Sequence, residues 1–118
     1  MSITFPWPPA ILSPNARSHY MVKAKAAKKY RLACYFLARK AGLSVPEGRL
    51  LLVLEFVPPD RRHRDDDNLV ASFKSGRDGL AQALGIDDHS FVTQCSISPE
   101  IVRGGEVRVT IKEHMPCA

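Results

Sequence analysis

The stretch that decides the fold is RLLLVLEFVPPDRRHRDDDNL, residues 49–69. Its first part, Arg49–Val57, carries apolar side chains at both alternating sets of positions, which predicts a central strand covered on both faces. These apolar positions are Leu50, Leu51, Leu52, Val53, Leu54 and Phe56. Pro58 and Pro59 then end the strand, so the charged segment after them connects a central strand to a helix.

The flanking sequence supplies the other elements of one domain. Alternation and turn residues predict strands and helical spacing predicts helices. The strands are expected at Ser2–Phe5, Arg49–Val57, Phe91–Ile97 and Glu106–Lys112, and the helices at about His19–Ala41 and Asp67–Leu84. The order β-α-β-α-β-β predicts a single α/β (α+β) domain over residues 1–118, with one mixed sheet and two helices.

Each predicted helix has an apolar stripe that should face the sheet. The first stripe comprises Val22, Ala26, Tyr30, Ala33, Leu37 and Ala41, and the second comprises Leu69, Phe73, Leu80 and Leu84. Gly76 and Gly79 either weaken the second helix or allow another element to pack closely against it.

Charge is distributed unevenly along the 118 residues, although the net charge is only +5. Residues 1–46 contain eight basic residues and no acidic one, whereas residues 47–118 contain nine basic and twelve acidic residues. Five of the seven aspartates fall in two groups, Asp65–Asp67 and Asp87–Asp88. This pattern indicates a polyanionic partner together with a cation site.

The first group, Asp65–Asp67, requires a compensating cation. Neighbouring carboxylates at ~4 Å repel by about 1 kcal/mol in water and by about 4 kcal/mol near a protein surface. Neighbouring arginines and helix capping by Asp67 or Asn68 are one explanation, but capping accounts for one residue of three. The other explanation is Mg²⁺, which binds one or two carboxylates and keeps several waters.

The second group, Asp87–Asp88, lies beyond a predicted helix of ~18 residues, which is ~27 Å long. Asp88 therefore starts far from Asp67 in one copy of the chain. The next strand could run back past the first group, or the second group could come from the other copy of a tight dimer. Alternatively, Asp87–Asp88 is a solvated turn.

Basic residues near the acidic groups suggest phosphodiester chemistry. Arg61, Arg62 and Arg64 directly precede the first group and are candidate phosphate ligands. Lys74 is seven residues after Asp67, so it would lie on the same face of one continuous helix and could stabilise charge on phosphate. An exposed lysine without a catalytic role is the alternative, and His63 and His89 are interpreted as surface histidines.

The three cysteines, Cys34, Cys95 and Cys117, have no CxxC spacing. They are therefore interpreted as reduced thiols of a cytoplasmic protein, two of them buried, and not as zinc ligands or a disulfide framework. The longest apolar run, Leu50–Leu54, is too short to cross a bilayer, so we expect no membrane partner.

Four stretches make the chain similar to the RusA family of Holliday junction resolvases over nearly its whole length. These stretches are an opening strand with a proline turn at 3–9, a D-x-D-N signature with preceding arginines at 57–69, a double aspartate at 85–88 and a Gly-Gly strand at 104–111. The resemblance implies a homodimeric, Mg²⁺-dependent endonuclease that cuts four-way DNA junctions symmetrically, encoded by bacteria or phages and acting in recombination and repair.

The resemblance also assigns site residues. Asp65 and Asp67 match the signature aspartates, and Asp88 matches the later catalytic aspartate. The family's lysine would lie three residues after the signature asparagine, but Ala71 stands there, and Lys74 is the nearest lysine.

The sequence therefore predicts a structure-selective endonuclease of the cytoplasm, associated with the nucleoid. Asp65, Asp67 and Asp88 would bind Mg²⁺, with Mn²⁺ as a substitute, and Lys74 would assist. The residues expected to hold branched DNA are Lys25, Lys28, Arg31, Arg61, Arg62 and Arg64. The alternatives are a non-catalytic basic DNA-binding module and a metal nuclease that acts on flaps or RNA.

Overall fold

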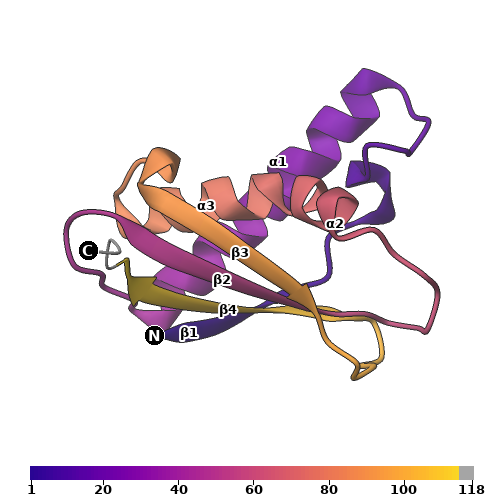
Figure 1. Cartoon of the computed structure of the whole chain (residues 1–118). Coiled ribbons are helices and arrows are strands. Elements are labelled where there is room, and N and C mark those ends of the chain that lie inside the picture. The colour runs from indigo at the N-terminus through magenta and orange to yellow at the C-terminus, as the bar shows by residue number, and fades with distance from the viewer. Residues whose placement is uncertain (115–118) are drawn as a thin grey trace.

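The computed structural model describes residues 1–114 and has one mixed four-stranded sheet with helices on one face (Figure 1). The strands are β1 (Ser2–Pro6), β2 (Leu50–Val57), β3 (Phe91–Ile97) and β4 (Glu106–Glu113), in the spatial order β1-β4-β2-β3. The helices are α1 (Tyr20–Ala41), α2 (Asp66–Ser72) and α3 (Lys74–Leu84). Two short 3-10 helices, η1 (Ala10–Leu12) and η2 (Asp88–Ser90), complete the described elements. The predicted α+β class is confirmed.

Strand β2 is central, as predicted, because it pairs antiparallel with β4 and parallel with β3. Leu50, Leu52, Leu54 and Phe56 of β2 are fully buried under the helices. The prediction that both faces are covered is wrong, since Leu51 and Val53 on the other face are only half-buried. Within residues 1–114 no helix lies over this second face, which carries polar side chains such as Thr4, Thr110 and Arg108.

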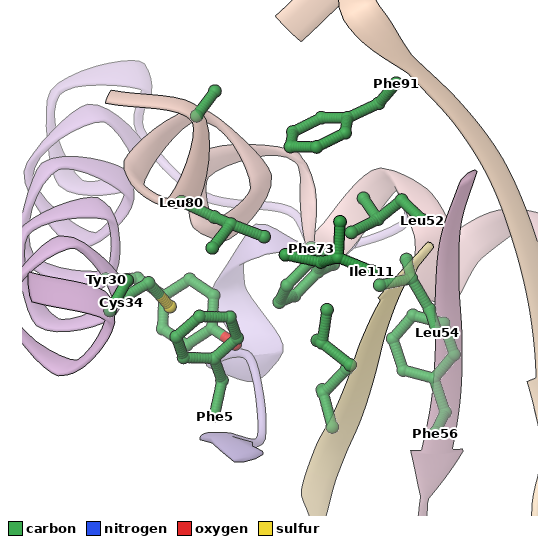
Figure 2. Close-up of a cluster of buried hydrophobic side chains, with 14 of the residues drawn as sticks. Phe5, Tyr30, Cys34, Leu52, Leu54, Phe56, Phe73, Leu80, Phe91 and Ile111 are labelled. Atoms are coloured by element: carbon green, nitrogen blue, oxygen red, sulfur yellow. The ribbon is translucent and has the colours of Figure 1, made fainter. Parts of the chain in front are cut away.

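The core between the sheet and the helices is built around aromatic rings (Figure 2). Phe73 is 1% exposed, and its ring centroid lies 6.0 Å from Phe5 and 6.2 Å from both Tyr30 and Phe56. The predicted single helix is interrupted at this residue. Phe73 adopts φ −86° and ψ −4°, so α2 ends and α3 begins where the ring enters the core.

The buried face of α1 overlaps the predicted stripe at Tyr30 but otherwise differs from it. Its buried residues are Tyr30, Cys34 and Ala38, whereas Val22 of the predicted stripe is 51% exposed and Leu37 is 38% exposed. The packing of α3 explains which face of α1 is buried, because Gly79 of α3 lies directly against the carbonyl oxygen of Arg31 of α1. Gly79 therefore allows close helix packing, and this contact selects the face of α1 that turns inward.

The thiols within the described residues agree in part with the prediction. Cys34 and Cys95 are both free, but only Cys34 is buried and Cys95 is half-buried. Cys117 lies outside the described residues. None of the helices within residues 1–114 combines the length and the apolar character that a membrane crossing requires.

Candidate metal and nucleic-acid site

The first aspartate group lies at the start of α2, where the connection from β2 enters the helix. Asp65 is the N-cap residue, and its Oδ1 accepts a hydrogen bond of 3.2 Å from the backbone N–H of Asp67. Asp66 Oδ1 accepts from the same N–H at 3.0 Å. The expectation that Asp67 or Asn68 caps the helix is therefore wrong, because the helix begins one residue earlier. Capping therefore accounts for the carboxylate of Asp65. It does not account for those of Asp66 and Asp67, which lie in the first turn of α2.

The connection before α2 is organised by Asp60, a residue that the sequence analysis did not single out. Its carboxylate accepts from the backbone N–H of Arg62 at 2.9 Å and from Arg64 at 2.9 Å. The Arg62 hydrogen bond and, after it, the Arg64 guanidinium hold the pKa of Asp60 below its usual range. An aspartate that accepts from the amide two residues later is a recognised turn signal, so the sequence offered a means of finding Asp60.

Arg64 points into this loop. Its side chain is 16% exposed and donates to the carbonyl oxygens of Asp60 at 3.1 Å and Arg62 at 3.0 Å. The guanidinium also lies over the ring of Trp7, 5.5 Å from its centroid. Arg64 thus fastens the loop to the proline turn, while Arg61 and Arg62 remain exposed.

The carboxylates of Asp65, Asp66 and Asp67 are exposed and can place one oxygen each within 4.8 Å of the others. The arginines before them are paired with Asp60 instead, at 3.3 Å for Arg62 and 2.9 Å for Arg64. Among residues 1–114, no lysine or arginine forms an ion pair with the three carboxylates. Their mutual repulsion is therefore not relieved by a protein cation, and oxygen-only donors suit a hard divalent ion.

A groove beside this group has a volume of about 550 Å³. Its walls are the proline turn with Trp7, the loop with Arg62 and His63, and the beginning of α2 with Asp65 and Asn68. Exposed Arg62 and Asp65 of the first group therefore border the same hollow, an arrangement that suits phosphate binding next to a metal.

The second aspartate group lies at the start of η2, directly before β3. Asp87 caps η2 by accepting from the backbone N–H of His89 at 2.9 Å, and the His89 ring lies 2.8 Å from the same oxygen. The hydrogen bond from the His89 backbone, followed by the Asp88 side chain, lowers the pKa of Asp87. The carbonyl oxygen of Asp88 accepts from Arg77 at 2.9 Å, which fixes η2 to α3.

The structure does not bring the two acidic groups together within one chain. Asp65 and Asp66 line a hollow with Ser96 and Ile97, near the end of β3, whereas Asp88 directly precedes its start. Burial raises the pKa of Cys95, and the charges of Asp66 and Asp67 add to this rise. The five residue steps from Phe91 to Ser96 span roughly 17 Å.

The remaining predicted residues lie apart from the acidic groups. Lys74 is exposed and lines a different groove, together with Lys23 of α1 and Asp78. The break at Phe73 also removes the continuous helix on which the shared face of Asp67 and Lys74 depended. Lys25 and Lys28 are exposed on the first half of α1, whereas Arg31 is half-buried beside α3.

The chain is similar over most of its length to several known proteins. No family model matches it. An uncharacterized protein of Xylella fastidiosa is 50% identical over 114 residues, which covers 93% of this chain and 74% of that protein. The crossover junction endodeoxyribonuclease RusA of Escherichia coli strain K12 is 31% identical over 121 residues, covering 95% of this chain and 93% of that protein. RusA of Shigella sonnei matches with the same values.

Proposed function

Because the chain belongs to the RusA family, we propose that it is a divalent-metal-dependent endonuclease that resolves four-way DNA junctions by paired nicks. The observation that carries the proposal is the group Asp65–Asp67, whose exposed carboxylates have no ion pair with a protein cation within residues 1–114 and whose Asp65 borders a groove together with exposed Arg62. Nucleases of this kind need both features, an oxygen-rich metal site and cations that hold the phosphate.

The donor set fits Mg²⁺, with Mn²⁺ as a substitute, because it consists of carboxylate oxygens that are accessible to solvent. Asp65 and Asp67 would hold the ion, which when bound neutralises charge on the phosphate and makes a coordinated water more acidic. Asp65 also remains bonded to the Asp67 backbone N–H, so the helix cap fixes the direction of one metal ligand.

Asp88 would complete the site from a second copy of the chain. Ligands of one Mg²⁺ lie about 2.0–2.1 Å from the ion, whereas Asp88 and the first group lie at opposite ends of β3 in one copy. Two active sites related by a two-fold axis also match the two nicks of a symmetric junction. The homodimer would therefore be needed for metal binding as well as for paired cleavage.

Arg62 would hold a backbone phosphate at the groove beside Asp65, and Arg61 would hold one at the neighbouring hollow that Arg62 also lines. Lys25 and Lys28 would hold phosphates farther away. These contacts do not depend on base sequence and weaken with salt. Arg64 would act through the loop, because its guanidinium is already bonded to Asp60. Lys74 remains a candidate for stabilising charge on the phosphate. It lines the groove that faces α1, and cleavage by a Lys74→Ala variant tests this role.

The test is incubation with a synthetic mobile four-way junction in Mg²⁺, with mapping of the cuts. We expect paired symmetric nicks from the wild-type chain and none from Asp67→Asn, which keeps the size and the helix start. A flap and an RNA hairpin serve as competing substrates. Preferred cleavage of either substrate, or a wild-type rate for Asp67→Asn, would contradict the proposal.

Metal binding can be tested without cleavage. Titration with Mn²⁺ or Mg²⁺ should raise the thermal stability of the wild-type chain, since a ligand that binds only the folded state stabilises it. Asp65→Asn should abolish this rise. Junction binding without any metal-dependent rise would favour the non-catalytic DNA-binding module.

A further inference from the structure

The outer face of α1 carries a phenylalanine that points away from the core. The buried residues of this helix are Tyr30, Cys34 and Ala38. Phe36 lies two positions from both Cys34 and Ala38, which is about 200° around a helix, so its side chain projects from the opposite side. Phe36 is 63% exposed, and Leu32, one turn earlier on the same side, is 37% exposed. Two bulky apolar side chains therefore form a ridge in contact with solvent.

The ridge is fixed in place and uncovered. The ring centroid of Phe36 lies 5.2 Å from that of half-buried Tyr35, with the ring planes at 70°, and edge-to-face pairs of this kind are stabilising. Helix α1 packs against β1, η1 and α3, and the exposure of Leu32 and Phe36 shows that no element within residues 1–114 covers them. An aromatic anchor held in this way loses little freedom when a partner binds.

Cations surround the ridge. Lys29 precedes Phe36 by two turns, and Arg39 and Lys40 follow it by one turn, so all three are on the same side of the helix and are exposed. None of them forms an ion pair within residues 1–114, and residues 1–46 contain no acidic residue. Arg39 and Lys40 also suit the C-terminus of a helix, but that role explains neither Lys29 nor the apolar ridge.

We infer that this outer face of α1 binds an acidic segment of another protein, which places apolar side chains against the ridge and carboxylates against the cations. The face consists of Lys29, Leu32, Phe36, Arg39 and Lys40, and it spans roughly 16 Å along the helix. Complementary charge would guide the segment to the face, and the buried apolar contact would supply most of the affinity.

Two other occupants fit this face less well. The phosphates of DNA would pair with the cations, but they would leave Leu32 and Phe36 exposed to water. A second copy of the same face would bring cations against cations, which is unfavourable. The inference adds a protein partner to the proposed function and uses none of the residues of the aspartate groups or the arginine loop.

Fluorescence anisotropy with a labelled synthetic peptide tests the inference. The probe is a helix-forming peptide of about 12 residues that carries glutamates and two leucines one turn apart, and a control peptide has serine in place of each leucine. The full chain should bind the leucine peptide, and Phe36→Ala should weaken binding about tenfold or more with unchanged far-UV circular dichroism. Met21→Ala is the matched control, because Met21 is 62% exposed on the same helix but lies about four turns before Phe36; it should bind as the wild type does.

Equal binding of the two peptides, or equal binding by the wild type and Phe36→Ala, would overturn the inference. Unpaired bases also stack on aromatic rings, so a single-stranded oligonucleotide is the second probe. If Phe36→Ala loses oligonucleotide binding and keeps peptide binding, the face belongs to nucleic acid and the inference is refuted. A changed oligomeric state of Phe36→Ala in light scattering would assign the face to a second copy, with the same consequence. Phe36→Ala should cut junctions at the wild-type rate, so a failure of the peptide test is distinguishable from a failure of the proposed endonuclease activity.

Discussion

Two variants that are inactive separately, Asp67→Asn and Asp88→Asn, should restore junction cleavage when they are mixed. The reason is the separation of the two acidic groups at opposite ends of β3. If each active site combines Asp67 of one copy with Asp88 of the other, a mixed dimer contains one site with both aspartates. Its second site carries both substitutions.

The expected magnitude follows from counting sites. Equal amounts of the two variants that exchange freely give about half mixed dimers, and one site in two is complete in each of them. About one quarter of all sites are therefore intact, so the nicking rate should reach about one quarter of the wild-type rate. Each variant alone should lose about a hundredfold or more. The mixture should produce single nicks, because no dimer has two complete sites.

The assay is cleavage of an end-labelled junction after the two proteins have been incubated together, with native mass spectrometry to measure the mixed dimer. A mixture of Asp65→Asn and Asp67→Asn is the matched control. Both substitutions affect the same half of the site, so no mixed dimer has a complete site and cleavage should stay low. Confirmed mixed dimers of Asp67→Asn and Asp88→Asn without recovery would refute assembly of the site from two copies.

Three further outcomes test the fold and the site. Gly79→Ala should lower the free energy of unfolding by about 1–3 kcal/mol, although alanine favours a helix by about 1 kcal/mol, because the new Cβ would meet the Arg31 carbonyl; a stabilised variant in urea unfolding would exclude this contact. Lys74→Ala should reduce junction cleavage less than tenfold, because Lys74 lines the groove facing α1; a loss equal to that of Asp67→Asn would place it in catalysis. Burial raises the pKa of the Cys34 thiol to about 12, so iodoacetamide at pH 8 should leave Cys34 unmodified until urea is added, and rapid labelling of the folded chain would contradict its burial.

Strand positions could be predicted well because alternation of apolar side chains is a local property. The strand predicted at Phe91–Ile97 has those bounds in the structure, and the helix predicted from His19 begins at Tyr20. The buried face of α1 could not be predicted in the same way. Apolar residues such as Phe36, which is 63% exposed, lie on several sides of this helix, and its packing against Gly79 determines which side is covered.

The candidate site also combines features that could be predicted from the sequence with features that could not. The two aspartate groups were recognisable because clustered carboxylates are unfavourable without a cation. The partners of the arginines were not recognisable, since Arg62 and Arg64 pair with Asp60 and not with the three aspartates next to them. The predicted position of Lys74 depended on one continuous helix, whereas the structure divides this segment at Phe73 into α2 and α3.

The sequence by itself determined the candidate site residues, namely the two aspartate groups and the arginines before the first of them, and the approximate positions of the strands and helices that carry them. These features depend on residue type and short spacing, which local physical chemistry is sufficient to interpret. The tertiary structure decided where they lie. Strand order and helix packing result from contacts between distant segments, and the parallel pairing of β2 with β3 places Asp88 and Asp65 at opposite ends of one edge strand.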